Sequence, residues 1–234
     1  MVDATHARFP NTQWTMVLHA GGDGEAARAA LEMLARSYWK PVYAFIRARW
    51  GADPEEARDL TQAFFVTLID GTLLERASPG RGRFRGFVKA ALSCFLVNEK
   101  RDRERVKRGG GRTAVALDGV APEVAAAGRT PDQVLDDEWK KQLLARAADR
   151  LRDELGAAGK ALSFQLFDAY FVAGSASYRD LAVQHGITES AVSDHLMASK
   201  RRFRDILHDL LSETVADTGE LEEEWRALFP GMKP

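Results

Sequence analysis

The side chains with the most reactive chemistry in this chain do not form a catalytic arrangement. Ser193, Asp194 and His195 are consecutive. On a helix they would point in three directions and could not act as a nucleophile, base and orienting group. The glycine-rich segments GRGRFRG and GGGR lack the Gly-Lys-Ser/Thr ending of a nucleotide-binding loop. The histidines show no paired metal-ligand spacing. An enzyme is therefore a poorly supported alternative, and we expect no catalytic residue, no metal site and no cofactor.

The segment from Ser177 to Leu207 has the spacing of a helix-turn-helix. Ser177 can cap a first helix, Ala182 is small enough for two helices to cross closely, and Gly186 supplies the backbone freedom of a tight turn. Thr188 can then cap a second helix. The alternative is a plain helical hairpin with a solvated charged end. The spacing favours DNA binding.

The second helix of this motif separates into a core face and an outward face. Val192 and Leu196 would hold it on the core, and basic residues follow toward its end. The residues expected to look toward a major groove are Glu189, Ser190, Ser193 and His195, and the following cations are Lys200, Arg201, Arg202 and Arg204.

A second basic segment runs from Asn98 to Arg112, with seven basic and three acidic residues. It follows Phe84, Arg85, Phe87 and Lys89. Mixed aromatic and basic side chains suit single-stranded nucleic acid, because unstacked bases rest on rings while phosphates meet cations. The alternative is a solvated helix face with both phenylalanines in the core.

Helices must position these residues, because apolar residues recur at helical spacing and alternating β-branched runs are nearly absent. We predict an all-α protein. One helix should run over 31–49, bent or restarted at Pro41. Another should start at the cap Asp53, with Pro54 in its first turn, and run to about Ile69. It would bury the stripe of Ala57, Leu60, Phe64 and Leu68 and leave Asp59, Gln62 and Val66 free for a partner. A third helix is predicted over 87–107.

The chain is predicted to form two small helical domains joined by a flexible linker. The segment 109–130 is rich in glycine and alanine and has no sustained periodicity. After it, Thr130, Pro131 and Gln133 form a capping box. The predicted limits are 1–108 for the first domain, 109–130 for the linker, 131–212 for the helix-turn-helix domain and 213–234 for an acidic tail.

Composition bounds the class of protein. The 234 residues are 45% hydrophobic and carry a net charge of −1, which excludes bulk coating of nucleic acid and leaves local basic clusters to make any DNA contact. The single cysteine, Cys94, cannot form an internal disulfide. No run approaches the roughly 20 apolar residues of a membrane span, and the first residues do not resemble a signal peptide. We expect a soluble cytoplasmic protein with no membrane insertion.

Four motifs together resemble the extracytoplasmic-function (ECF) sigma factors of the sigma-seventy superfamily. SYWKPVYAFIRAR, DLTQAFF, GRFRGFVKAALSCFLVNEKRDR and the helix-turn-helix occur in the family's order and spacing. The resemblance covers about Leu31 to Arg108 and Trp139 to Leu211. It implies a region-two-like helical bundle and a helix-turn-helix domain. It also implies a factor that binds RNA polymerase core and directs promoter recognition, DNA melting and transcription initiation.

The resemblance also implies roles for individual residues. The DLTQ helix would dock on the clamp of the largest polymerase subunit, although Ala63 stands where the family usually has glutamate. The family commonly has a tryptophan at the position of Phe87, an asparagine at that of Cys94 and an aspartate at that of Asn98. These three positions bear on which promoter base is flipped out of the stack and bound. The implied polymerase contacts are Asp59, Gln62 and Phe65; the minus-ten contacts are Phe84, Arg85, Phe87, Lys89, Asn98, Arg101, Arg103 and Arg105; the minus-thirty-five contacts are Tyr178, Thr188, Glu189, Ser190, Ser193, Asp194, His195, Lys200 and Arg201.

Two questions stay open at the level of sequence. A helix-turn-helix regulator that does not carry polymerase shares the DNA-binding half of this interpretation. The acidic tail has a short amphipathic stretch, Leu221, Trp225, Leu228 and Phe229, which either packs on the second domain or restrains DNA binding near Lys200 to Arg204. Otherwise a separate anti-sigma factor or a kinase would restrain a signal-responsive factor.

Overall fold

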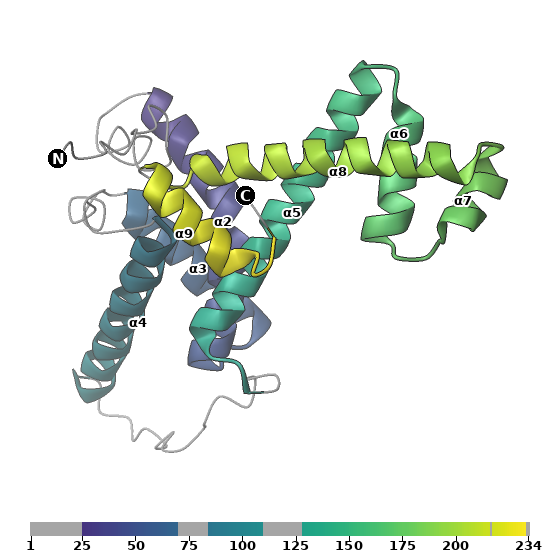
Figure 1. Cartoon of the computed structure of the whole chain (residues 1–234). Helices are drawn as coiled ribbons and strands as arrows, with labels where there is room; N and C mark the ends of the chain where they lie inside the picture. Colours follow the sequence, from purple (N-terminus) through teal and green to yellow (C-terminus); the bar gives the residue numbers. More distant parts are fainter. Residues whose placement is uncertain (1–24, 70–83, 110–127, 216, 233–234) are drawn as a thin grey trace. The chain divides into compact units, whose positions relative to one another are not determined.

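The structure, a computed structural model, describes residues 25–69, 84–109, 128–215 and 217–232, and the regular elements in these ranges are helices (Figure 1). This confirms the all-α prediction. By contacts the chain divides into unit 1, residues 1–140 and 212–224, and unit 2, residues 141–211 and 225–234. The predicted linker lies outside the described residues except at 109 and 128–130. The predicted domain limits at 108, 130 and 212 stay predictions.

Helix α2 (Glu25–Trp50) opens the described part of unit 1 and continues through Pro41. Proline has no N–H to donate to the preceding turn, which is why the sequence predicted a bend or a restart. No restart occurs. The side chains of Tyr38, Val42 and Phe45 flank the proline and are almost fully buried. Burial of several large apolar side chains outweighs the loss of one backbone hydrogen bond.

Helix α3 (Pro54–Ile69) begins at the cap predicted for it. The Asp53 carboxylate accepts hydrogen bonds from the backbone N–H groups of Glu55 and Glu56, each at 2.9 Å. The predicted stripe is buried at all four positions: Ala57, Leu60, Phe64 and Leu68. The opposite face is therefore left to solvent or to a partner.

Helix α4 (Phe84–Gly109) leaves the core as it proceeds. Its first three turns bury Val88, Leu92 and Phe95, whereas Val97 is already 49% exposed. Helix α5 (Pro131–Ala157) begins at the predicted capping box. The Gln133 N–H donates to Thr130 Oγ1 at 3.2 Å, and the Thr130 N–H donates to Gln133 Oε1 at 2.8 Å. Both predicted helices are present, and α4 starts three residues earlier than expected.

Unit 2 continues α5 into α6 (Ala161–Phe167), the π-helical turn η4 (Asp168–Val172), α7 (Tyr178–His185) and α8 (Glu189–Ser212). In Figure 1 the short α7 lies at the N-terminal end of the long α8. The core of the unit includes Leu151 and Leu166, together with Ile206 from α8. The ring of Phe167 lies 5.1 Å from that of Phe203. The motif is thus held by α8 packing on α5 and α6.

Helix α9 (Thr218–Leu228) forms the largest part of the predicted acidic tail. Its amphipathic stripe, Leu221, Trp225, Leu228 and Phe229, is buried. The indole N–H of Trp225 donates to the Met232 carbonyl at 2.8 Å. The C-terminal segment is therefore packed, but residues 212–224 group with unit 1 and only residues 225–234 group with unit 2, whereas the sequence suggested packing on the second domain. Among the helices that the structure describes, none has the length and apolar character needed to cross a membrane.

Candidate nucleic-acid and polymerase interface

The turn between α7 and α8 has the geometry that the sequence predicted. Ser177 and Asp180 form a reciprocal capping box at the start of α7. The side-chain hydrogen bond from Ser177 holds the pKa of Asp180 below its usual range. Gly186 ends α7 in the left-handed conformation at φ 65°, which a residue with a Cβ adopts only under strain. Thr188 Oγ1 accepts from the Ala191 N–H at 3.1 Å and caps α8. The motif is therefore a well-formed helix-turn-helix.

The first turns of α8 present the predicted outward face only in part. Val192 and Leu196 are buried, whereas Glu189, Ser190 and Asp194 are exposed. Thr188 is also exposed, at the cap. These exposed residues form a short surface of carboxylates and hydroxyls. The carboxylates can accept hydrogen bonds from DNA bases, and the hydroxyls can accept or donate them.

The sequence predicted that His195 points outward toward a major groove. In the structure it lies against a neighbouring helix instead. Its Nδ1 lies 2.8 Å from the Oγ of Ser163 on α6, within hydrogen-bond distance. Ser199 donates to the Ser163 carbonyl at 3.3 Å, so two residues of α8 are tied to the same residue of α6. Ser193 is half-buried. The groove-facing set is therefore narrower than predicted, because α6 covers one side of α8.

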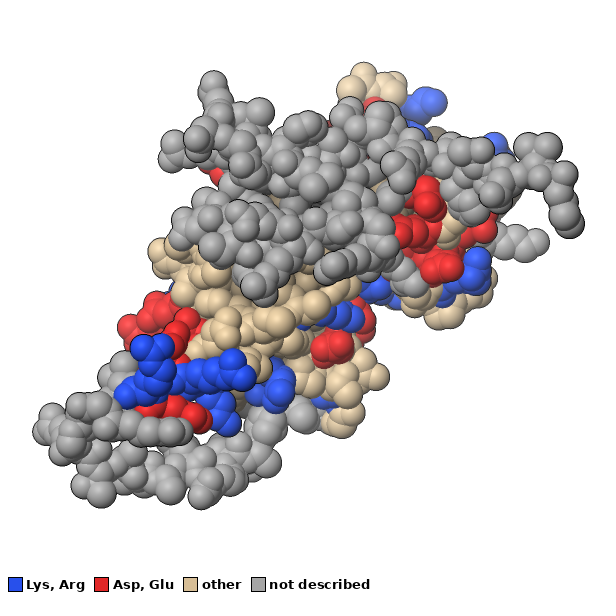
Figure 2. All heavy atoms as spheres, turned by 90° about the vertical axis from the view of Figure 1, so that its left-hand side faces the viewer, with Lys and Arg blue, Asp and Glu red and all other residues tan. Residues whose placement is uncertain are grey.

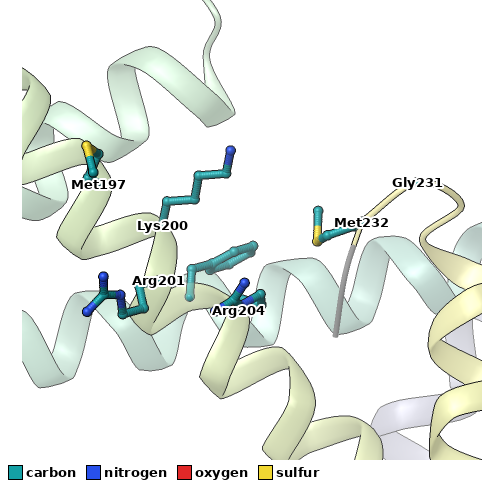
Figure 3. A pocket seen from close by; sticks show the side chains of 7 residues that line it. Met197, Lys200, Arg201, Arg204, Gly231 and Met232 are labelled. Carbon is teal, nitrogen blue, oxygen red and sulfur yellow. The ribbon is translucent and has the colours of Figure 1, made fainter.

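The cations after this turn line an open cavity of unit 2. Lys200, Arg201 and Arg204 on α8 surround it together with Met197, Phe203, Gly231 and Met232, and its volume is about 550 Å³ (Figure 3). The Lys200 ammonium lies 5.8 Å from the centre of the Phe171 ring. Tyr178, a predicted DNA contact, is half-buried with its ring 5.0 Å from that of Tyr170. The residues of the C-terminal segment beside these cations are apolar, so they offer no carboxylate to neutralise them.

Arg202 has a structural partner. Its Nε and Nη2 donate to the two carboxylate oxygens of Glu154 at 2.6 and 2.9 Å, and Arg150 donates to the same carboxylate at 3.0 Å. The hydrogen bond from Arg202 is the main cause that lowers the pKa of Glu154 to about 2. Arg202 thereby fastens α8 to α5.

The α3 face predicted to bind polymerase is partly internal. Asp59 and Gln62 are exposed, and Val66 on the same side is 49% exposed. Phe65 is only 6% exposed, and its ring stacks on Trp39 with the centroids 5.8 Å apart. As the unit stands, Phe65 supports the face from behind and does not form part of it.

The first half of α4 is likewise internal. Phe84 is fully buried, with its ring edge-on to Tyr38 at 5.4 Å. Arg85 is buried and makes ion pairs, and the Lys89 ammonium lies 2.7 Å from the carboxylate of Asp136. Phe87 is half-buried. Phe84 and Arg85, which the sequence placed on DNA, therefore belong to the core of unit 1 in this conformation.

The second half of α4 carries the exposed members of the predicted minus-ten set. Asn98, Arg101, Arg103 and Arg105 are all exposed. Arg103 forms an ion pair with Glu56 and lies 5.5 Å from the centre of the Trp50 ring, and Arg105 donates to Asp102 at 3.1 Å. Figure 2 shows Lys and Arg side chains gathered beside Asp and Glu side chains on this face. These pairings do not involve Asn98 or Arg101.

Sequence reasoning missed two carboxylates that organise unit 1. Asp136 and Glu224 both pair with Arg85, each at 2.8 Å. A signal was present for Glu224, because it lies at helical spacing from Leu221 and Leu228 and therefore on the apolar stripe of its helix. A charge in that position needs a buried partner.

Comparison with known protein families agrees with this geometry. A family model described as ECF sigma factor matches residues 11–197, most of the chain. The chain belongs to the ECF sigma factor family. Comparisons with curated proteins and with solved structures found no match.

As an ECF sigma factor, the protein binds RNA polymerase core and promoter DNA and directs promoter recognition and transcription initiation. It is a non-catalytic subunit of the holoenzyme. Membership sets aside both the enzyme and the regulator that does not carry polymerase. In the described ranges, no group of three or more His, Cys, Asp or Glu side chains is arranged to hold a metal ion.

Proposed function

We propose that three exposed helix faces divide the work of this sigma factor. The α3 face of Asp59, Gln62 and Val66 would bind the clamp of the largest polymerase subunit. The distal half of α4, with Asn98, Arg101 and Arg105, would bind the minus-ten element. The first turns of α8, with Glu189, Ser190 and Asp194, would bind the minus-thirty-five element, with phosphate contacts from Lys200 and Arg201.

The division of α3 into two faces carries the proposal for polymerase. Five apolar residues of α3 are buried, so its core side is fully used. The remaining side carries a carboxylate, an amide and a half-exposed valine at helical spacing. A polar rim beside an apolar residue is typical of a protein interface.

The packed C-terminal segment bears on how the factor is restrained. Its apolar stripe of Leu221, Trp225, Leu228 and Phe229 is buried and its last described residues, 228–232, carry no acid, so it is not a free acidic arm. We therefore propose that a separate protein, an anti-sigma factor or a kinase, restrains it. Since promoter DNA in bacteria lies in the cytoplasm, we propose that the factor acts there.

The polymerase face can be tested with the full chain and purified core. Run-off transcription on genomic fragments should first yield discrete transcripts and a promoter fragment. Changing Asp59→Ala together with Gln62→Ala should then weaken core binding at least about tenfold, equivalent to about 1.4 kcal/mol. Thermal unfolding should hardly change, because exposed substitutions usually alter stability by about 0.5 kcal/mol or less.

A matched control is Asp149→Ala with Gln165→Ala, an exposed carboxylate and amide in unit 2. This control should bind core normally. If the α3 variant also binds core as the unchanged protein does, the polymerase contact does not lie on this face. If it unfolds, the two residues are structural.

A further inference from the structure

The segment after the family match is an integral part of unit 1. The match ends at residue 197, yet residues 212–224 group with unit 1 by contacts. Thr214, Val215 and Leu221 of this segment are buried. Apolar burial of this kind holds a segment in place, because removing apolar surface from water is favourable. The segment therefore has a defined position in the unit.

Glu224 is the most unusual residue of this segment, since it is a carboxylate with only 1% of its side chain exposed. Its Oε1 lies 2.8 Å from Nη2 of Arg85, whose side chain is 9% exposed. A buried charge is costly unless an opposite charge and hydrogen bonds compensate for it. The pair is thus a specific connection between α9 and α4.

Arg85 joins three helices through this connection. Its Nη1 donates to Asp136 of α5 at 2.8 Å, and its guanidinium lies 5.3 Å from the centre of the Trp139 ring. Lys89 of α4 donates to the other Asp136 oxygen at 2.7 Å. Two cations of α4 are therefore balanced by two carboxylates, one on α5 and one on α9. Removing either carboxylate leaves excess positive charge inside the unit.

This network lies at the start of α4, so a small change in its geometry would displace the distal half of the helix. Arg85 is the second residue of α4, and Asn98 lies thirteen residues further along. At 1.5 Å per residue, the two are about 20 Å apart along the axis. A tilt of about 6° at the start would move Asn98 by about 2 Å, which is enough to break a hydrogen bond.

We propose that Glu224 is a positioning residue for promoter opening: through Arg85 it ties α9 to the first turn of α4 and fixes the direction in which α4 presents its distal half to DNA. This inference rests on the proposed role of α4 at the minus-ten element. The C-terminal segment would then contribute to DNA binding by orienting α4. Arg85 then acts inside the protein and makes no contact with DNA.

The test uses the full chain in the holoenzyme on the promoter fragment. With Glu224→Gln, permanganate reactivity of the melted thymines and promoter output should both fall at least about tenfold, because the Arg85 charge loses one of its two carboxylates. Core binding should stay within about twofold. The matched control is Glu223→Gln, an exposed glutamate of the same helix, which should open the promoter normally. Normal or increased opening by a folded Glu224→Gln protein would overturn the inference.

A second variant separates positioning from DNA contact and covers the case in which Glu224→Gln does not fold. Arg85→Met with Glu224→Leu replaces the ion pair by apolar side chains of similar size, an exchange that buried pairs often tolerate. This variant should open the promoter to within about threefold of the unchanged protein. If it folds and fails to open DNA, unbalanced charge on Arg85 is not the cause of the Glu224→Gln defect, and the inference as argued is wrong.

Failure of the proposed function has a different signature. Arg101→Ala with Arg105→Ala removes exposed cations of α4 and leaves the network intact. If that variant opens the promoter normally, α4 does not bind the minus-ten element. If it is impaired while Glu224→Gln is normal, only the positioning inference fails.

Discussion

Glu154 shows how one half-exposed carboxylate fastens the recognition helix. It accepts two hydrogen bonds from Arg202 of α8 and one from Arg150 of its own helix. A bidentate pair of a guanidinium with a carboxylate fixes orientation as well as distance. Arg202, which the sequence grouped with the DNA-facing cations, is therefore occupied within unit 2.

The same pair predicts a pH dependence of stability. The pKa of Glu154 falls from an ordinary 4.5 to about 2 in the folded protein, chiefly through the hydrogen bond from Arg202. A depressed folded-state pKa contributes stability that is fully present above the ordinary value and is lost as the pH falls toward the folded value. Both side chains are about a third exposed or more, so solvent screening limits the contribution to about 1 kcal/mol or less.

We expect Glu154→Gln to lower the melting temperature of the full chain at neutral pH and to flatten its fall between pH 4.5 and pH 2. Thermal melts monitored by circular dichroism at several pH values measure both effects. Asp194→Asn, at an exposed carboxylate of α8, is the control. In this variant the melting temperature should fall at low pH as steeply as in the unchanged protein. If the melting temperature of Glu154→Gln falls equally steeply at low pH, the Glu154–Arg202 pair does not contribute to stability.

At the scale of elements, the turn between α7 and α8 depends on backbone conformation. Gly186 has φ 65°, and a Cβ built there meets no atom within 4 Å. Any cost of a side chain at this position is therefore conformational strain. Gly156, inside α5, also has open space around a Cβ but has an ordinary helical backbone.

Alanine should therefore have opposite effects at these two glycines. Gly186→Ala should destabilise the protein by about 1–2 kcal/mol, because an L-residue resists the left-handed conformation. Gly156→Ala should stabilise it by about 0.5–1 kcal/mol, because alanine restricts the unfolded chain and suits a helix. Urea unfolding of both variants measures the difference. Shifts of the same sign would contradict the strain account.

At the scale of the whole molecule, we expect promoter affinity to be shared among several weak contacts. The net charge is −1, and the α8 surface before Lys200 carries Glu189 and Asp194 but no lysine or arginine. Binding of the duplex by unit 2 should therefore be weak by itself. We expect tethering through polymerase to supply the missing affinity as a high effective concentration.

We expect Ser193→Lys to strengthen binding of the upstream duplex and to steepen the slope of log affinity against log salt by about 0.9, the contribution of one phosphate contact. Titrations at two salt concentrations, on the promoter and on point-mutated promoters, measure both quantities. If the variant instead loses discrimination between these DNAs with no change in slope, Ser193 or Asp194 reads a base directly. Asp194 could do so by accepting from a cytosine amino group.

Local signals were sufficient for most of the fold. The caps at Asp53, Thr130, Ser177 and Thr188 and the left-handed Gly186 all lie where the sequence predicted them. Caps and tight turns involve atoms within four residues of one another, so residue type and spacing nearly decide them. At Pro41, where the sequence predicted a bend or a restart, no restart occurs, and buried side chains on both sides of the proline support a continuous α2.

Residue type and periodicity by themselves determined that the described helices form and that the chain contains a helix-turn-helix. The resemblance to the ECF sigma factors came from four motifs in the order of that family. Only the tertiary structure decided which of the candidate contacts are exposed. Phe65, Phe84 and Arg85 are buried, and His195 turns toward Ser163. The physical reason is that exposure depends on which helices cover a given face. Arg85 meets Asp136 and Glu224 across 51 and 139 positions of the chain, and no local pattern specifies such a meeting.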